Sequence, residues 1–323
     1  MGTDRAGDLL GDRYRLVSPF HREDGGVMWR AHDLRLKRDV VVREVRPPAH
    51  IDGSDLPAAR LHALGEARSA ARLAHPAIVT VHDLLEDHGR IWMVTELLRG
   101  LTLKETVRHL GRLPIHWAAW VGFQLLAGIR YAHAAEVLHD GIRPSRVLLT
   151  EERVVLTGFG FATPENMPAA TAPSPYTAPE RLLGRRPDQA SDLWSFAATL
   201  YYGVEGRPPY PADEVRSGRA GEPEAVTAAS GAYGDAGSAP EDASADRHGG
   251  SVLTADDRGE PDPPRKAGPL RPVLEGLLRV DPDRRLTAEA ATALLVELLK
   301  KEGIAATLPG RRAESPLPPS FTK

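Results

Sequence analysis

Three arginines and one aspartate are the residues of this chain whose types and positions could carry chemistry. Asp140 could accept the proton of a hydroxyl group as a general base. Arg43, Arg143 and Arg146 could converge on one anion pocket, because a guanidinium presents several donors to phosphate oxygens. Such a pocket could bind a nucleotide or another phosphate compound without a metal ion such as Mg²⁺. The alternative is that these arginines pair internally with Glu66, with Asp140 or with solvent.

The elements that must position these residues fall into two regions. Between residues 14 and 96, short β-branched runs such as 40–42 and 91–94 predict strands, and residues 61–74 predict a helix. From residue 103 onward helical periodicity dominates. The predicted helices of this second region cover residues 117–133, 193–204, 270–279 and 288–301. A mostly β segment followed by a mostly α one predicts an α+β protein of two lobes.

Residues 211–268 differ in composition from the rest of the chain. They are rich in Gly, Ala, Ser and Pro and carry 12 acidic and six basic residues, a net charge of −6. Such a segment cannot bury enough apolar surface to offset its ordering entropy, so we interpret it as a disordered insert. It could tether or shield a binding face, or be a solvated spacer. The predicted divisions are a tail at 1–12, an N-lobe at 13–96, a C-lobe at 97–210 and 269–303, the insert at 211–268 and a Pro-rich tail at 304–323.

A series of short motifs resembles those of protein kinases, and in particular bacterial Ser/Thr kinases. The motifs, in chain order, are R-D-V-V-V-R at 38–43, the αC-type Glu66, H-P-A-I-V at 75–79, the hinge-like T-E-L-L at 95–98, H-D-G-I-R-P-S-R at 139–146, G-F-G at 158–160, A-P-E at 178–180, S-D-L-W-S at 191–195 and D-P-D-R-R at 281–285. The resemblance implies a two-lobed protein-kinase-like fold with a small, mostly β N-lobe, one αC-type helix and a larger, mostly α C-lobe. It also implies that Arg285 pairs with Glu180.

The same resemblance implies that the reacting groups are replaced. When H-R-D-x-K-P-x-N is laid without a gap over residues 139–146, the catalytic Asp falls on Gly141, the Lys on Arg143 and the metal-ligating Asn on Arg146. The metal-ligating Asp of D-F-G falls on Gly158, and the phosphate-binding Lys of the third strand falls on Arg43. These five degenerate positions leave neither a catalytic residue nor a metal ligand.

The charge of Arg146 opposes a metal ion at this position. Mg²⁺ requires oxygen ligands, whereas at ~4 Å and an effective dielectric constant near 20 a guanidinium repels a divalent cation by about 8 kcal/mol before screening. We therefore expect no metal site. Arg43 alone could reflect a general preference for Arg, because only six of the 41 basic residues are Lys. A one-residue slip would put Asp140 at the base position, but it breaks the ungapped fit.

The cleft implied by the resemblance is a candidate nucleotide or anion site. Its candidate residues are Gly26, Arg43, Glu66, Glu96, Leu98, Arg143 and Arg146. The glycine-rich loop at 21–26 keeps only Gly26, and Glu23 and Asp24 would repel phosphates. Asp140 takes the place of the Arg that would receive an activation-loop phosphate, so a phosphate on Thr163 or Thr171 has no docking cation there.

We therefore expect a pseudokinase, a regulatory or scaffolding module that binds a protein partner such as an active kinase or a signalling protein. The alternative is a weak ATP-dependent Ser/Thr kinase with Asp140 as base.

The composition bounds the partners and the location of the protein. The net charge of −3 gives no electrostatic footprint for nucleic acid. The absence of cysteine fits a reducing interior. The N-terminus lacks a signal-peptide pattern and the most apolar window, 117–129, is too short to span a bilayer, so we expect a cytoplasmic protein.

Overall fold

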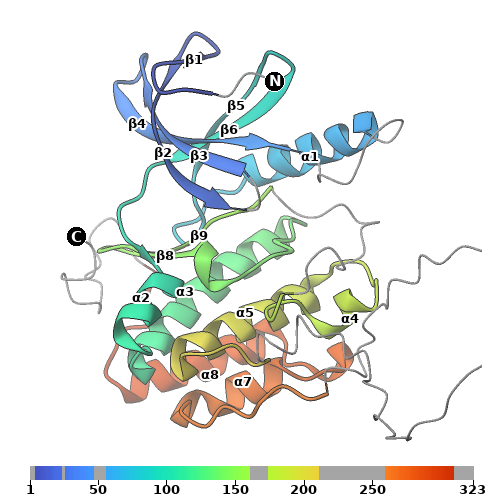
Figure 1. The fold of residues 1–323 in the computed structure, drawn as a ribbon. Helices are drawn as coiled ribbons and strands as arrows, with labels where there is room; N and C mark the ends of the chain where they lie inside the picture. The colour runs from blue at the N-terminus through green and yellow to red at the C-terminus, as the bar shows by residue number, and fades with distance from the viewer. Residues whose placement is uncertain (1–3, 24–25, 47–55, 161–173, 211–258, 309–323) are drawn as a thin grey trace, which may run out of the picture.

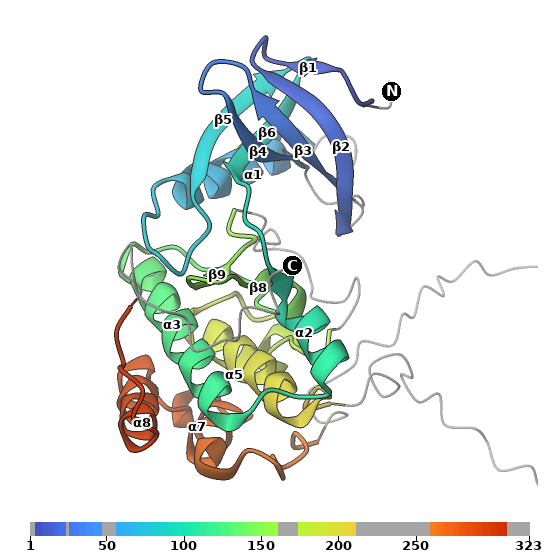
Figure 2. The same cartoon turned by 90° about the vertical axis from the view of Figure 1, so that its left-hand side faces the viewer.

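The computed structural model describes residues 4–23, 26–46, 56–160, 174–210 and 259–308. The chain forms an upper lobe built on a curved sheet and a lower lobe built of helices (Figure 1). In the view turned by 90°, the sheet and α1 stay together above, and α7 and α8 lie farthest from them at the bottom (Figure 2). This arrangement confirms the predicted two-lobed α+β fold.

The N-lobe is a six-stranded sheet with the order β1-β2-β3-β4-β6-β5, in which every neighbouring pair is antiparallel. The strands are β1 (Leu9–Leu10), β2 (Tyr14–Glu23), β3 (Gly26–Asp33), β4 (Arg38–Val45), β5 (Val81–Asp87) and β6 (Arg90–Glu96), and helix α1 spans Leu56–Ala71. Because side chains alternate along a strand, Val40 and Val42 of β4 enter the core of the sheet, whereas Val41 and Arg43 face the space between the lobes.

The C-lobe is organised around α3 and α5. Its elements are β7 (Leu101–Thr102), α2 (Leu103–Leu110), α3 (Ile115–Ala134), β8 (Val147–Leu149), β9 (Val154–Leu156), α4 (Pro179–Leu182), α5 (Gln189–Glu205), α7 (Arg271–Leu277) and α8 (Ala288–Lys301). Helix α5 is buried along almost its whole length, including Trp194 and Phe196. Its first turn is fixed by a capping box between Asp188 and Ser191. A stretch this apolar on all sides is typical of a helix at the centre of a domain.

The predicted boundaries of the lobes need three corrections. Residues 4–12 belong to the N-lobe rather than to a tail, because β1 pairs with β2 and Asp4 accepts two hydrogen bonds from Arg90 at 2.6 and 2.8 Å. Residues 259–268, assigned to the disordered insert, pack on the C-lobe: the amide of Lys266 donates to Glu205 Oε1 at 2.6 Å, and Ala267 is fully buried. Ile304, assigned to the Pro-rich tail, still packs against the core.

The other parts of those predictions concern residues 211–258 and 309–323, which lie outside the described residues. Thr163 and Thr171 also lie outside them. Within the described ranges, no helix combines the length and the apolar character that a membrane span requires.

Candidate functional site

The β8–β9 hairpin brings together the two segments of the expected reaction centre, residues 139–146 and residues 158–160. Val147 of β8 pairs with Leu156 of β9, so the residue before β8 lies opposite the residue after β9. Those residues are Arg146 and Thr157, and both the amide and the hydroxyl of Thr157 donate to the carbonyl of Arg146, at 2.8 and 3.1 Å. Gly158 follows directly. The register of the hairpin therefore fixes Arg146 beside Gly158.

The side chain of Arg146 fills the space in which the missing side chains would begin. A Cβ on Gly158 would lie 2.9 Å from Arg146 Cδ and 3.1 Å from Arg146 Nε. A Cβ on Gly141 would lie 2.4 Å from Arg146 Nη1, which donates a hydrogen bond to the carbonyl of Gly141 at 3.2 Å. Arg146 is only 5% exposed. The guanidinium thus lies between the two glycines, and an aspartate at either glycine position would require it to move.

Glycine is required at two positions of the G-F-G segment. Gly158 and Gly160 have φ angles of +95° and +77°, in the region that side chains with a Cβ rarely adopt. A Cβ on Gly160 would meet Ala67 Cα of α1 at 2.9 Å, so the segment lies directly against this helix. Between the two glycines, Phe159 is buried and its ring contacts His139 edge-on, with 4.5 Å between ring centroids.

The loop that carries Gly141 is anchored from below by Asp192 of α5. Asp192 is buried and accepts hydrogen bonds from the amides of His139 and Asp140, at 2.8 and 2.9 Å, and from His133 Nε2 at 2.9 Å. His139 Nε2 donates to the carbonyl of Thr157 at 3.0 Å. Burial, reinforced by the charge of Arg146, lowers the pKa of His139 to about 4. His139 is therefore a neutral structural residue at neutral pH.

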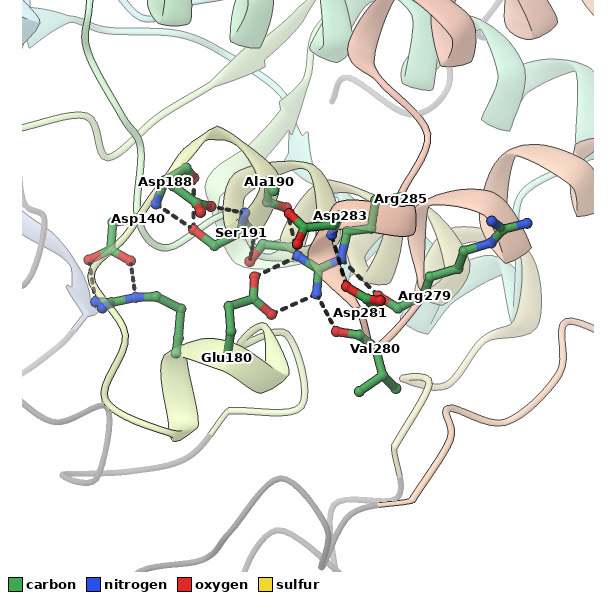
Figure 3. Close-up of polar contacts among 12 residues, drawn as sticks. Asp140, Glu180, Asp188, Ala190, Ser191, Arg279, Val280, Asp281, Asp283 and Arg285 are labelled. Atoms are coloured by element: carbon green, nitrogen blue, oxygen red, sulfur yellow. Dashed lines mark hydrogen bonds and ion pairs between the residues drawn. The ribbon is translucent and has the colours of Figure 1, made fainter.

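Asp140, the alternative base, is engaged by an arginine that the sequence analysis did not consider. Arg181 of α4 donates from Nε to Asp140 Oδ1 at 3.2 Å and from Nη2 to Oδ2 at 3.1 Å. Both side chains are nearly buried, with 5% and 11% of their area exposed. Burial raises the pKa of Asp140 and outweighs the opposing attraction of Arg181. The carboxylate is thus turned toward α4 and held there by two hydrogen bonds (Figure 3).

The predicted pair between Glu180 and Arg285 is present and deeply buried. Arg285 donates from Nη1 and Nη2 to the two carboxylate oxygens of Glu180 at 2.5 and 2.6 Å (Figure 3). The same guanidinium also donates to three backbone carbonyls, those of Arg279, Val280 and Ala190. Every donor direction of the guanidinium is used, which is the condition under which a buried charge pair is tolerated. This bond ties the A-P-E segment to the end of the C-lobe.

A cleft of about 750 Å³ lies between the lobes. Its apolar lining includes Val41, Met93, Leu98 and Leu148, and its floor includes Arg143, Ser145, Thr157 and Gly158. Arg43 lines the cleft as well but is only 9% exposed. Lys104 and Arg108 of α2 and the tyrosines Tyr176 and Tyr202 also line it.

The structure brings together four of the seven residues predicted for this cleft. Arg43, Glu96, Leu98 and Arg143 line it. Arg146 is buried against the two glycines, Glu66 lies on α1 and Gly26 begins β3. The three arginines therefore do not all reach the cleft surface: two line it, and the third is held beneath Gly158.

Both carboxylate oxygens of Glu96 are engaged by contacts that the sequence did not reveal. Glu96 accepts a hydrogen bond from Arg153 Nη2 at 2.6 Å and another from the amide of Thr80 at 2.8 Å. Arg153, in the β8–β9 turn, also donates to the carbonyl of Pro76. The salt bridge thereby connects the end of β6 in the N-lobe to the β8–β9 turn of the C-lobe.

The residues at the reaction centre do not fit the Mg²⁺ ion that a kinase fold implies. Glycines at 141 and 158 provide no side-chain oxygen, and the third position carries the Arg146 guanidinium. Among the described residues, no group of three or more His, Cys, Asp or Glu side chains is placed to hold a metal ion. A divalent cation would need oxygen donors where this chain has a fixed positive charge.

The fold and this order of motifs define a protein kinase domain, and comparison with known proteins agrees. The family model described as protein kinase domain matches residues 25–295. The chain belongs to this family.

Two bacterial proteins show how similar this chain is to known members of the family. The serine/threonine-protein kinase PknA of Mycobacterium tuberculosis is 33% identical over 225 residues, which cover 65% of this chain and 51% of PknA. The probable serine/threonine-protein kinase SCO3848 of Streptomyces coelicolor is 32% identical over 217 residues, covering 63% of this chain and 32% of that protein. The matched region thus spans about half of PknA and about a third of SCO3848.

Among solved structures, the kinase domain of M. tuberculosis PknI superimposes with a TM-score of 0.64 at 21% sequence identity. The match covers 94% of this chain and all of that domain. At this identity the similarity concerns the fold alone.

Two functional features were missed by the sequence analysis. The Asp140–Arg181 pair was missed because Arg181 was not considered, although it directly follows the A-P-E motif and Asp140 stands where a cation was expected. The cleft-lining face of Lys104 and Arg108 was missed as well, although their spacing of four residues places both on one side of a helix.

Proposed function

We propose that this chain is a pseudokinase, a cytoplasmic kinase-fold module that acts by binding a protein partner and not by Mg²⁺-dependent phosphoryl transfer. The observation that carries the proposal is the position of Arg146, whose side chain lies where the aspartates of a kinase would project from residues 141 and 158. The replacements at these three positions fit one another sterically. They form a packed unit and are not three independent losses.

The electrostatics of the unit support the same conclusion. Phosphoryl transfer by this fold depends on metal ions that bridge the phosphates, and on a base that orients the hydroxyl group. A buried guanidinium at the metal position disfavours the ion, by about 8 kcal/mol at ~4 Å and an effective dielectric constant near 20. Loss of a positioned base alone costs roughly 10²- to 10⁴-fold in rate. Arg43 retains a positive charge where the fold has lysine, but with a different donor geometry.

The architecture that a binding module needs is retained. The buried Glu180–Arg285 pair and the anchoring of the loop by Asp192 hold the C-lobe in the kinase arrangement. The partner that we propose is an active kinase or another signalling protein, which would recognise this kinase-like architecture.

A weak ATP-dependent Ser/Thr kinase is the second candidate, and the comparisons favour it, because the curated relatives are named serine/threonine-protein kinases. In this candidate Asp140 acts as the base. Its engagement by Arg181 opposes that role, since the two hydrogen bonds would have to break before the carboxylate could reach a substrate hydroxyl.

Phosphate transfer from radiolabelled ATP tests both candidates. The purified chain is assayed for autophosphorylation and for transfer to generic protein substrates with Mg²⁺ or Mn²⁺, beside an active Ser/Thr kinase domain prepared in the same way. The pseudokinase proposal expects background incorporation. Incorporation that is lost in an Arg43→Met variant would overturn it, and loss in Asp140→Asn as well would establish the second candidate.

A further inference from the structure

Helix α2 presents basic side chains that the fold leaves exposed. Lys104 and Arg108 are four residues apart, lie on the same side of the helix and are both exposed. Arg112, also exposed, follows two residues after the end of the helix. Within the described residues neither Lys104 nor Arg108 makes a salt bridge. Glu105, the one acidic residue of α2, is engaged in the capping box with Thr102. The basic face of α2, defined by Lys104 and Arg108, therefore lacks a counter-charge among the described residues.

The two ends of the acidic insert meet close to this face. The described chain stops at Tyr210 and resumes at Gly259, and the hydroxyl of Tyr210 donates a hydrogen bond to the carbonyl of Gly259 at 3.2 Å. Four residues before Tyr210, Gly206 at the end of α5 lies against the end of α2, because a Cβ on Gly206 would collide with the carbonyl oxygen of Gly111. Residues 211–258 therefore begin and end near the C-terminal end of α2.

The chain between these two ends supplies the opposite charge. Residues 211–258 contain ten acidic and four basic residues, a net charge of −6. One stretch of them, residues 235–246, contains four acidic residues and neither Lys nor Arg, and we call it the acidic segment. Its carboxylates belong to Asp235, Glu241, Asp242 and Asp246. Complementary charge of this kind directs the acidic segment toward exposed cations that have no counter-charge.

The connection between the acidic segment and Gly259 is long enough to reach α2. Twelve residues separate Asp246 from Gly259, and an unstructured chain of that length has a root-mean-square span of about 20 Å. Helix α2 has only 8 residues, which corresponds to a length of about 12 Å. A tether of this kind raises the effective concentration of the acidic segment at α2 to the order of millimolar. The tether therefore favours this occupant over a separate acidic protein that offers the same contacts.

We propose that the acidic segment docks on the basic face of α2, where its carboxylates pair with Lys104 and Arg108. The contact is intramolecular and holds the insert against the C-lobe. An acidic partner that used the same face would have to displace the acidic segment. This docking does not depend on the absence of phosphoryl transfer, since no residue of the reaction centre takes part in it.

Carbodiimide cross-linking of the full chain, followed by peptide mass spectrometry, tests this docking. The reagent joins a lysine amine to a carboxylate in contact with it, and Lys104 is one of only six lysines in the chain. We expect a cross-link between Lys104 and the acidic segment that persists on dilution. The cross-link should be lost at ~0.5 M salt, where the Debye length is about 4 Å. Lys300, which is exposed on α8, serves as the control and should not react with the acidic segment.

Three results of the cross-linking would overturn the docking. The first is the absence of a cross-link at Lys104, and the second is an equal yield of cross-links at Lys104 and Lys300. The third is cross-linking between two copies of the chain only, which would assign the basic face of α2 to a second copy.

Two variants separate docking from chance encounters of reactive groups. Arg108→Gln removes a charge that supports the contact but does not itself react with the carbodiimide. The yield of the Lys104 cross-link should therefore fall about threefold, the effect of losing one exposed charge pair. Arg35→Gln removes an equal charge from the exposed turn between β3 and β4 and should leave the yield unchanged. Equal yields in the two variants would contradict docking at α2. Thermal unfolding of both variants verifies that they are folded.

Discussion

The side chain of Arg146 packs directly against Gly158. A Cβ on Gly158 would lie only 2.9 Å from Arg146 Cδ. The contact follows from the register of the β8–β9 hairpin, which places Arg146 opposite Thr157. The arginine that replaces one expected metal ligand thus depends on the glycine that replaces the other. This dependence can be measured as a coupling between the two positions.

Gly158→Ala should destabilise the fold by about 2 kcal/mol, because alanine is strained at a φ of +95° and its Cβ collides with Arg146. In an Arg146→Asn background the collision is removed, and the cost should fall by about 1 kcal/mol. Denaturant unfolding of the wild type, the Gly158→Ala and Arg146→Asn single variants and the double variant measures both values.

Gly141→Ala is the matched control for the Gly158→Ala substitution. Its Cβ meets only the end of the same side chain, so the cost should be under about 1 kcal/mol. Identical costs for Gly158→Ala in the two backgrounds would show that the residues are not coupled.

The fold was predictable because several short motifs occur in kinase order, and each depends on local sequence. The helix at Ala288–Lys301 was predicted with its observed bounds, and the Glu180–Arg285 bond was implied by two motifs 105 residues apart. The ends of the lobes were less predictable. Ala267 and Ile304 lie in polar, Pro-rich surroundings, and their burial comes from distant partners that composition does not reveal.

The sequence predicts the residue types of the candidate site, but it could not predict the side-chain geometry that the structure shows. Sequence indicated that Gly141, Arg146 and Gly158 replace reacting groups. The position of the guanidinium between the glycines required the backbone path of both loops. The Asp140–Arg181 pair likewise depends on where α4 lies, and the orientation of Glu96 toward Arg153 depends on the β8–β9 turn.

Glu180→Gln should cost about 3–5 kcal/mol of folding stability, because it leaves the buried guanidinium of Arg285 without its counter-charge. The free energy of unfolding in denaturant measures the loss. Glu297→Gln is the control, since it breaks the exposed pair with Lys301 on α8, and it should leave stability unchanged within error. A comparable, small effect of both substitutions would mean that the A-P-E segment is not held by this bond.

The Asp140–Arg181 pair should hold α4 to the loop without any phosphate. In an Asp140→Ala variant, amide hydrogen exchange over residues 176–185 should accelerate about tenfold, equivalent to about 1.4 kcal/mol. A double variant that swaps the two charges, Asp140→Arg with Arg181→Asp, should recover part of the protection of these amides against hydrogen exchange. Asp283→Asn, which alters an exposed carboxylate, serves as control. Unchanged exchange in Asp140→Ala would show that the pair does not restrain the segment.

Stability should fall in mild acid because His139 is buried in its neutral form. Its pKa is lowered from an ordinary value near 6.5 to about 4, so the unfolded chain binds a proton in this range and the folded chain does not. The stabilising contribution is complete above pH ~6.5 and is lost as the pH falls toward ~4, for a total of about 3 kcal/mol.

The difference in unfolding free energy between wild type and His139→Asn, followed from pH ~7 to ~4, isolates this effect, because other histidines contribute equally to both proteins. Wild type should lose more stability than the variant over this range. Parallel pH profiles would show that His139 titrates normally in the folded chain.

Electron paramagnetic resonance of Mn²⁺ tests the absence of a metal site most directly. The ion is titrated into the chain with and without ATP, and the signals of free and nucleotide-bound Mn²⁺ are compared with those of ATP alone. A variant that combines Gly141→Asp, Arg146→Asn and Gly158→Asp restores the oxygen donors and is the positive control. We predict that the wild-type chain leaves the spectra of Mn²⁺ and Mn²⁺–ATP unchanged, whereas the restored variant binds the ion. Stoichiometric binding of Mn²⁺–ATP by the wild-type chain would contradict this account.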